Sequence, residues 1–353
     1  MPDEKDVNTP MAEDSPSAPP QAAILKITGQ VLPARCIGVV AELNVAEHLA
    51  NEPKTAADLA KKCGAHAPTL YRILRYLASI GIFEERPDGT FVNTPQSDVL
   101  RDGVPGSVRM LVRQRWQDVT WDVYRALPEA VASPTGIPAF DLAHGNPFFD
   151  FLAENPDLNA LFDAAMAMMS GPENDVIAAT FPFEGVRRVC DIGGGQGGLL
   201  AAILKRHSNI HGVLFDQSQV IAEPAHLNAA GMIDRCDLIA GDFFETAPPD
   251  CDVYLLKRIL HDWSDADAGR ILTSVREAMP GDGRVVIIDA LLKPGNEPDP
   301  NKFLDLGIMT LLRGRERTES EMKDVLNSAR FELETVYPPE APSTLSMTVG
   351  KPA

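Results

Sequence analysis

The 353-residue chain is long enough for two domains and has ample apolar content to bury a core in each. Its formal net charge of −18 would repel phosphate backbones and anionic lipid headgroups, so we expect neither a nucleic acid nor a membrane as partner. The five cysteines are scattered without a C-x-x-C pair, which argues against a disulfide framework or a zinc site and favours reduced thiols in a cytoplasm.

The N-terminal residues 1–20 are acidic and rich in Pro, Ser and Ala. They lack the basic and apolar regions of a signal peptide, so we predict a disordered tail. From Ala22 to about Leu49 apolar residues recur at helical spacing, with a break expected near Pro33. This helix is either ordinary core or the contact surface of a partner subunit. No uncharged apolar run approaches the ~20 residues that cross a bilayer.

Residues 21–100 predict a small, mostly helical domain. Thr55 is the expected N-cap of a short helix that ends at Gly64, and a second helix begins at Ala67. Two extended runs then flank the dipeptide Asp88-Gly89, a pattern typical of a hairpin. Helix, turn, helix and hairpin follow one another in the order of a winged helix.

A winged helix suggests DNA binding, and the second helix offers Arg72 and Arg75 for it. Acidic residues surround that helix: Glu84, Glu85, Asp88, Asp98 and Asp102. We therefore favour a structural use of the fold, as a dimerisation or lid module.

Residues 101–175 predict an interrupted helical region that contributes to a substrate pocket. The region has a surplus of aromatic and methionine side chains: Trp116, Trp121, Phe140, Phe148, Phe149, Phe151, Phe162, Met166, Met168 and Met169. They form either ordinary core or the adaptable apolar wall of a pocket for a planar ligand.

Strands and helices alternate in residues 176–353. The expected strands are 189–192, 212–215, 236–239, 253–256 and 284–288, with helices between most of them. This alternation predicts an α/β fold with a Rossmann-like, doubly wound and mainly parallel sheet. Ligands of such sheets bind beyond the carboxyl ends of the strands, so the residues after each strand form the candidate site.

A glycine turn follows the first of these strands. Gly193-x-Gly195-x-x-Gly198 matches the pattern of dinucleotide-binding turns and opens a helix expected at Leu199. The pattern by itself fits either a cofactor site or a tight structural turn, and it would also permit a nicotinamide-dependent oxidoreductase.

Polar groups follow the next strands. Asp216 is placed to accept two ribose hydroxyls, and Asp242 could accept the amino hydrogens of an adenine that Phe243, after Gly241, covers. The fourth strand leads into Lys257-Arg-Ile-Leu-His261-Asp262-Trp263, and Asp289 follows the fifth. A histidine at this edge is a candidate catalyst.

Four motifs together resemble the S-adenosylmethionine-dependent small-molecule O-methyltransferases of plant phenylpropanoid and bacterial antibiotic biosynthesis. The motifs are Asp-Ile-Gly-Gly-Gly-Gln-Gly, Gly-Asp-Phe-Phe, Leu-Lys-x-x-Leu-His-Asp-Trp-Ser-Asp and Gly314-Arg-Glu316-Arg-Thr318-Glu-x-Glu. The resemblance begins near Ala22 and covers almost all of the remaining chain. It implies a class I methyltransferase domain, and a homodimer through the N-terminal domain.

The resemblance also implies roles for single residues. His261 would be the general base, Glu316 would orient it, and Asp289 stands where many plant members have a glutamate. The implied cofactor-binding residues are Gly193, Gly195, Asp216, Gly241, Asp242, Phe243, Lys257, Ser170 and Trp263. The implied acceptor pocket contains Phe162, Met166, Met169, Ile308, Met309 and Asp262.

The implied reaction is in-line methyl transfer to the hydroxyl of a small aromatic or polyketide-like acceptor, without a metal. A phenol has a pKa of ~10 and a free imidazole ~6.5, so prior deprotonation would cost about 5 kcal/mol. We therefore expect the proton to leave as the methyl group arrives, with orientation contributing ~7–11 kcal/mol. The alternatives are N- or C-methylation, or a non-methylating reaction such as hydroxylation or decarboxylation on the same fold.

Overall fold

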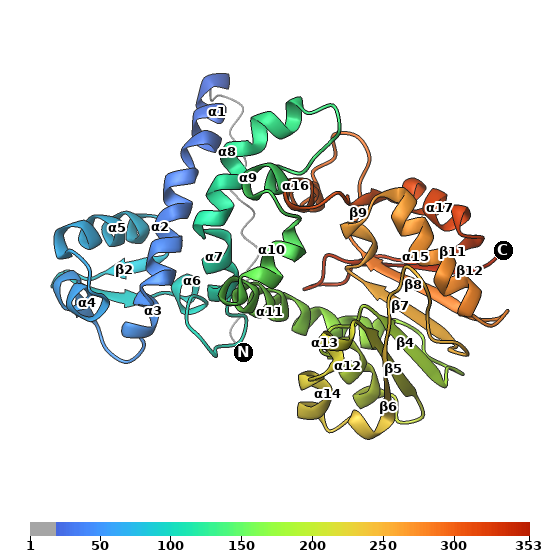
Figure 1. The fold of residues 1–353 in the computed structure, drawn as a ribbon. Coiled ribbons are helices and arrows are strands. Elements are labelled where there is room, and N and C mark those ends of the chain that lie inside the picture. Colours follow the sequence, from blue (N-terminus) through green and yellow to red (C-terminus); the bar gives the residue numbers. More distant parts are fainter. Residues whose placement is uncertain (1–18) are drawn as a thin grey trace, which may run out of the picture. The chain divides into compact units, whose positions relative to one another are not determined.

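The computed structural model describes residues 19–353, which form two compact units divided between Trp116 and Gln117 (Figure 1). The predicted N-terminal tail therefore lies outside the described residues, except for Pro19 and Pro20. The further boundaries expected near residues 100 and 175 stay a prediction, since the structure itself makes the single division.

The first unit contains helices and a small antiparallel sheet. The helices are α1 (Pro20–Gly29), α2 (Val31–Glu42), α3 (Val45–His48), α4 (Ala56–Cys63), α5 (Ala67–Ser79), α6 (Pro95–Asp98) and α7 (Arg109–Arg115). The strands are β1 (Lys54–Thr55), β2 (Phe83–Glu85) and β3 (Thr90–Asn93), in the order β1-β3-β2.

The predicted order of helices and hairpin is confirmed. The Thr55 side chain accepts the backbone N–H of Asp58 at the start of α4, and Gly64 ends this helix with φ +65°. The break expected near Pro33 is confirmed, and it falls at Gln30, between the end of α1 at Gly29 and the start of α2 at Val31, so that Pro33 lies in the first turn of α2. The N–H groups of a first turn have no intrahelical acceptor, so a proline costs little there.

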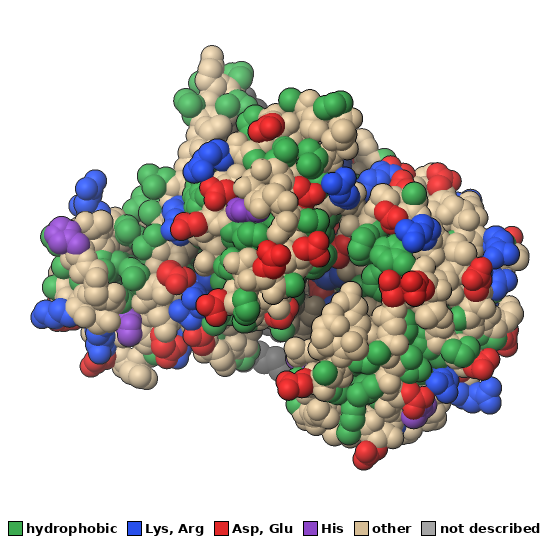
Figure 2. Space-filling model, viewed as in Figure 1, with side chains coloured by type: hydrophobic (Ala, Val, Ile, Leu, Met, Phe, Trp, Pro, Cys, Tyr) green, Lys and Arg blue, Asp and Glu red, His purple; other side chains and the backbone are tan. Residues whose placement is uncertain are grey.

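Helix α1 and the start of α2 present an apolar surface. The side chains of Ile24, Leu25, Ile27, Val31 and Leu32 are all more than half exposed, and hydrophobic atoms are visible on this helix in Figure 2. The stretch Pro20–Glu42 is apolar and long enough to cross a membrane by length and composition only, although it contains the charged residues Lys26, Arg35 and Glu42. The expectation from the sequence concerned only uncharged apolar runs, so this stretch was not anticipated.

The second unit is built on a seven-stranded sheet of order β11-β12-β8-β7-β4-β5-β6. The strands are β4 (Arg188–Ile192), β5 (His211–Asp216), β6 (Cys236–Ala240), β7 (Val253–Lys257), β8 (Arg284–Asp289), β11 (Phe331–Tyr337) and β12 (Ser346–Pro352). Strands β4 to β8 are parallel, and β12 pairs antiparallel with both β8 and β11. The predicted Rossmann-like sheet is confirmed, and the antiparallel edge was not predicted.

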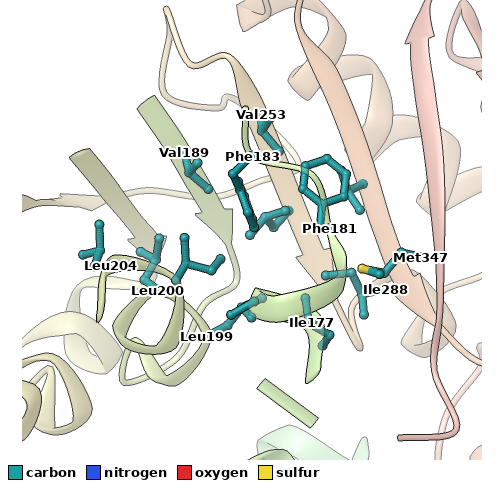
Figure 3. Close-up of a cluster of buried hydrophobic side chains, with 14 of the residues drawn as sticks. Ile177, Phe181, Phe183, Val189, Leu199, Leu200, Leu204, Val253, Ile288 and Met347 are labelled. Carbon is teal, nitrogen blue, oxygen red and sulfur yellow. The ribbon is translucent and has the colours of Figure 1, made fainter. Parts of the chain in front are cut away.

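Helices cover both faces of this sheet (Figure 1). They are α12 (Gly198–Arg206), α13 (Ser218–Ile221), α14 (Ala225–Ala230), α15 (Asp265–Ala278) and α17 (Glu319–Ser328), with the 3-10 turns η1 (Ile233–Arg235) and η2 (Leu260–Asp262). Val286 and Ile288 pack with α12 on one face, whereas Val285 and Ile287 pack with α15 and α17 on the other. Figure 3 shows the first of these cores, which the end of α11 (Pro156–Thr180) completes through Ile177.

The remaining helices of the second unit form a core of their own. They are α8 (Asp118–Ala132), α9 (Ala139–His144), α10 (Phe148–Glu154) and α16 (Asn301–Leu311), together with the first part of α11. Phe140 and Phe148 are buried in this core with their ring centroids 5.1 Å apart, whereas Phe149 is 45% exposed. Part of the aromatic surplus is therefore ordinary core.

Candidate functional site

The glycine turn joins the end of β4 to α12. Gly193 donates its N–H to the carbonyl of Phe215 at 2.8 Å, and Gly193 and Gly195 both have positive φ values, +67° and +58°. A Cβ on Gly193 would lie 2.5 Å from Ile259 Cδ1, whereas a Cβ on Gly195 would meet nothing within 4 Å. The turn is therefore packed against the protein at Gly193 and open to a ligand at Gly195.

Asp216 lies directly beside this turn, at the end of β5. Its Oδ2 accepts the N–H of Gly195 at 2.9 Å and its Oδ1 accepts that of Gln217 at 2.7 Å. Burial raises the pKa of this carboxyl group, against the two backbone hydrogen bonds that lower it. The glycine turn and the Asp216 carboxylate therefore lie together at the edge of the sheet, as the sequence predicted.

An aromatic cluster follows β6. The ring of Phe243 would lie 3.7 Å from a Cβ on Gly193, and its centroid is 6.0 Å from that of Trp263. Phe244 packs edge-on against Trp263 at 4.7 Å, and Asp242 accepts the N–H of Phe244 at 2.8 Å. The segments that follow β6 and β7 thus meet beside the glycine turn.

His261 lies in η2, just after β7, and is 5% exposed. Its Nδ1 donates to Glu316 Oε1 at 2.7 Å, since a carboxylate can only accept, and its Nε2 lies 3.4 Å from Asp262 Oδ1. Burial would lower the pKa of the imidazole, but the charge of Asp289 and the hydrogen bond to Glu316 outweigh it and raise the pKa to about 9. This nitrogen pattern leaves Nε2 as the ring atom that can take up a proton.

Asp289 reaches the same cluster at the end of β8. Strand β9 (Leu291–Leu292) pairs in parallel with β10 (Arg317–Thr318), and this pairing brings Glu316, the residue before β10, to the same place as Asp289, the last residue of β8, next to His261. Both carboxylate oxygens of Asp289 are buried without a hydrogen-bond partner. Burial raises the pKa values of Asp262 and Asp289 to about 6, although His261 lowers both. Asp289 therefore acts on the imidazole by charge.

Lys257 is paired with a residue that the sequence analysis missed. Its Nζ lies 3.1 Å from Oε2 of the buried Glu173 in α11, and Arg258 Nη2 donates to Oε1 of the same carboxylate at 2.6 Å. Burial raises the pKa of the nearby Asp191 to about 7, and the positive charge of Lys257 offsets part of this increase. An acidic residue in a long apolar helix was the available signal for Glu173. Ser170, one turn earlier in α11, lies on the same side of that helix.

The predicted pocket residues occupy two helices. Phe162, Met166 and Met169 are partly buried in α11, and the ring of Phe162 packs at 5.2 Å from that of Phe148. In α16, Ile308 is buried whereas Met309 is 42% exposed. Consecutive helical residues point about 100° apart, so these two side chains face different directions.

Two further residues that received no role from the sequence hold the site together. A Cβ on Gly314 would lie 2.0 Å from the carbonyl oxygen of His261, so the two backbones are in direct contact. The buried Ser274 of α15 donates to the carbonyl of Phe243 at 2.6 Å. Gly314 belongs to one of the motifs on which the family resemblance rests. No feature of the sequence pointed to Ser274.

Two sequence families match the chain. Residues 124–332 match the O-methyltransferase domain, and residues 27–102 match the O-methyltransferase dimerisation domain. The chain belongs to this methyltransferase family.

Among curated relatives of this methyltransferase, the phenazine O-methyltransferase PhzM of Lysobacter antibioticus is 38% identical over 89% of the chain and 91% of its own length. The mitomycin biosynthesis 6-O-methyltransferase of Streptomyces lavendulae is 38% identical over 86% of the chain and 87% of its own length. The 8-amino-8-demethylriboflavin N,N-dimethyltransferase of Streptomyces davaonensis is 36% identical over 85% and 86%. The relatives thus include both O- and N-methyltransferases of natural-product biosynthesis.

Several solved methyltransferase structures are similar to this chain over almost its whole length. The mitomycin 7-O-methyltransferase MmcR has a TM-score of 0.87 at 35% identity, covering 94% of this methyltransferase and 98% of its own chain. CalO1, a methyltransferase of calicheamicin biosynthesis in an S-adenosylhomocysteine-bound form, has 0.82 at 32%, covering 94% and 98%. The neocarzinostatin O-methyltransferase NcsB1, solved with S-adenosylmethionine and a naphthoic acid, has 0.77 at 29%, covering 91% and 96%.

These findings decide between the two cofactors that the glycine pattern permitted. The methyltransferase uses S-adenosylmethionine, with S-adenosylhomocysteine as product, and the nicotinamide alternative falls away. The chain's own residues fit this cofactor: the glycine turn is open at Gly195, and the carboxylate of Asp216 lies beside it.

The packing at Gly193 gives a prediction. Gly193→Ala would force a left-handed φ on a residue with a Cβ and push that Cβ into Ile259, at a combined cost of about 2–4 kcal/mol. We expect the midpoint of thermal unfolding to fall by about 5 °C or more. Gly281→Ala is the matched control, because its Cβ would meet nothing within 4 Å. Equal midpoints for the two variants would contradict the packing described here.

Proposed function

We propose that this protein transfers a methyl group from S-adenosylmethionine to a hydroxyl of a small aromatic or polyketide-like natural product, with His261 as general base. The observation that carries the proposal is the hydrogen bond of His261 Nδ1 to the buried Glu316, at 2.7 Å. It leaves Nε2 to accept a proton. Ile259, two residues before His261, packs against the glycine turn and so ties the base to the cofactor site.

The cofactor would be held by residues at the carboxyl ends of β4 to β7 and on α11. The proposed set is Gly193, Gly195, Asp216, Gly241, Asp242, Phe243, Lys257, Trp263 and Ser170. In this set Asp216 would accept the ribose hydroxyls, Asp242 the adenine amino group, and Phe243 and Trp263 would cover the adenine faces. Bound there, the sulfonium cofactor supplies a methyl group that is already electrophilic, so the protein must orient the acceptor and remove its proton.

The environment of His261 makes this proton transfer easier than the sequence suggested. A pKa of about 9 for the imidazole lies much closer to that of a phenol (~10) than the ~6.5 of a free imidazole, so the cost of moving the proton is well below the value expected from the sequence. Glu316 would fix the tautomer and stabilise the imidazolium, and Asp289 would add its charge without a hydrogen bond. The proton can therefore move to Nε2 while the methyl group is transferred.

The acceptor would contact apolar side chains of the helical region. Phe162, Met166 and Met169 of α11 and Ile308 and Met309 of α16 remain the proposed pocket, with Asp262 beside Nε2 of the base. The aromatic acceptors named for the phenazine and naphthoic acid relatives support a planar substrate.

N-methylation is the second candidate, favoured by the 36% identity to a riboflavin-type N,N-dimethyltransferase. An arylamine is already a neutral nucleophile and needs no base before it attacks. Mass spectrometry of products from matched phenols and arylamines on the same ring systems would separate the two reactions.

We further propose a cytoplasmic homodimer whose contact includes the apolar surface of α1 and α2. The match to the dimerisation domain and the exposure of Leu25 and Leu32, 70% and 71%, support it. A partner subunit on this surface would also account for the apolar stretch Pro20–Glu42 without a membrane.

Leu25→Lys combined with Leu32→Glu tests the dimer. Placing charges in an apolar interface removes its hydrophobic contribution and leaves the charges poorly solvated, so we expect the mass from light scattering to fall to that of a monomer. Leu238→Lys, an exposed position on β6, should leave the mass unchanged. A wild-type mass in the double variant would contradict this interface.

Replacement of the base tests the catalytic assignment. His261→Ala should lower methyl transfer to a phenolic acceptor by about 10²–10⁴-fold, since proton transfer in the transition state is lost. Calorimetry with S-adenosylhomocysteine should show retained binding, because the imidazole is not among the proposed cofactor contacts. Full turnover by the variant would refute the role of His261.

The raised pKa of His261 predicts the pH dependence. The base must be neutral to accept a proton, so protonation at low pH removes activity, and a raised pKa moves this loss to higher pH. With an acceptor that stays un-ionised throughout, the single-turnover rate should rise about tenfold per pH unit between 6 and 8 and level off near 9. A profile that is flat over this range, or one shared by His261→Ala, would contradict the assignment.

A further inference from the structure

The segment Gly314–Thr318 and the turn Leu260–Trp263 are in contact over most of their length. Gly314 is the point of closest approach, where an added Cβ would lie 2.0 Å from the carbonyl oxygen of His261 and 2.3 Å from the carbonyl carbon of Asp262. Only a residue without a side chain allows this approach of two backbones. The segment therefore lies directly against the turn that carries the proposed base.

Arg317 is the side chain that joins the two. Its guanidinium is 1% exposed, and its Nη1 and Nη2 donate to the carbonyls of Leu260 and Trp263, both at 2.9 Å. Its Nε donates to Asp265 Oδ1, also at 2.9 Å. The two carbonyls stand on either side of His261 and Asp262, so one rigid, planar group spans the turn from end to end.

The residue before Arg317 makes the contact to the ring. Glu316 Oε1 accepts from His261 Nδ1, and the backbone N–H of Glu316 donates to Asp305 Oδ1 of α16 at 2.9 Å. The backbone of the turn and its imidazole are thus held by consecutive residues of one segment. A shift of the turn relative to this segment would lengthen the bond between His261 and Glu316.

We propose that Arg317 is a positioning residue, which fixes the turn Leu260–Trp263 so that the imidazole of His261 meets the carboxylate of Glu316. The catalytic consequence rests on the proposed role of His261 as base. Arg317 itself is placed on the backbone carbonyls and Asp265, and it acts through the histidine.

Lysine cannot replace arginine in this geometry. Its single ammonium nitrogen carries the same charge but cannot reach two carbonyls and a carboxylate in the fork that the guanidinium provides. Arg317→Lys therefore preserves the charge near His261 and removes the geometry. The charged groups that face the imidazole cluster, namely Asp262, Asp289, Glu316, Arg258 and Arg317, keep their sign in this variant.

The test is an NMR pH titration of protein labelled with ¹³C at histidine Cε1 and saturated with S-adenosylhomocysteine. The His261 signal is identified by its absence in His261→Ala. In wild type we expect a titration midpoint well above 6.5. In Arg317→Lys we expect the midpoint to fall by at least one pH unit, because the turn no longer holds the imidazole against Glu316. At a pH above both midpoints, where the imidazole is neutral in both proteins, kcat with a phenolic acceptor that stays un-ionised should fall at least tenfold, while KM for S-adenosylmethionine changes less than threefold.

Arg315→Lys is the matched control. Arg315 shares the carboxylate of Asp265 with Arg317, at 2.8 Å, but within the described part of the chain it makes no hydrogen bond to Leu260 or Trp263. It should leave the midpoint and kcat unchanged. Gly314→Ala is a second test of the positioning role, because it displaces the same turn without changing any charge. Like Arg317→Lys, it should lower the titration midpoint of His261.

The outcomes separate this proposal from the proposed function. An unchanged midpoint in folded Arg317→Lys, or in Gly314→Ala if the first variant does not fold, overturns the positioning role whatever the activity. Full activity of His261→Ala instead overturns the base assignment, while a shifted midpoint in Arg317→Lys would still support the positioning of the ring.

Discussion

A buried imidazole among three carboxylates is the constraint on which this site depends. His261 is held by one short hydrogen bond to Glu316 and by the charges of Asp262 and Asp289; the imidazole, Glu316 and Asp289 are buried, and Asp262 is partly buried. Interactions at this depth are strong, but each is lost if the partners move by a fraction of a hydrogen-bond length. The turn that carries the histidine must therefore be fixed from outside the cluster.

The fold supplies that fixation by bringing distant segments to one edge of the sheet. Parallel strands β4 to β8 end side by side, which places the glycine turn, Asp216 and His261 around one space. The short pairing of β9 with β10 then delivers Glu316 to the same edge, opposite Asp289. In this arrangement the cofactor site and the base share a wall, because Ile259 contacts the glycine turn two residues before His261.

Local patterns in the sequence were enough to predict the sheet and the residues at its strand ends. Strand periodicity and the glycine pattern extend over only a few residues. They correctly placed the glycine turn, Asp216 and His261 at or just after the ends of strands. The supports of the site are long-range: Arg317 bonds to Leu260 across 57 residues, and Glu173 to Arg258 across 85. A single sequence does not show which charges meet across such distances. It also did not show that burial would raise the pKa of Asp289 while leaving its oxygens unpaired.

The role of His261 in removing the acceptor proton during methyl transfer is tested most directly by varying the acidity of the acceptor. Single-turnover methylation rates would be measured at pH 8 for phenols of one shape, with pKa values from about 7 to about 10. We expect His261→Ala to be severely impaired with the least acidic phenol and to approach the wild-type rate with the most acidic phenol, which is already ionised. An equal loss of rate across the whole series would contradict it, because the histidine would then act otherwise than as a base.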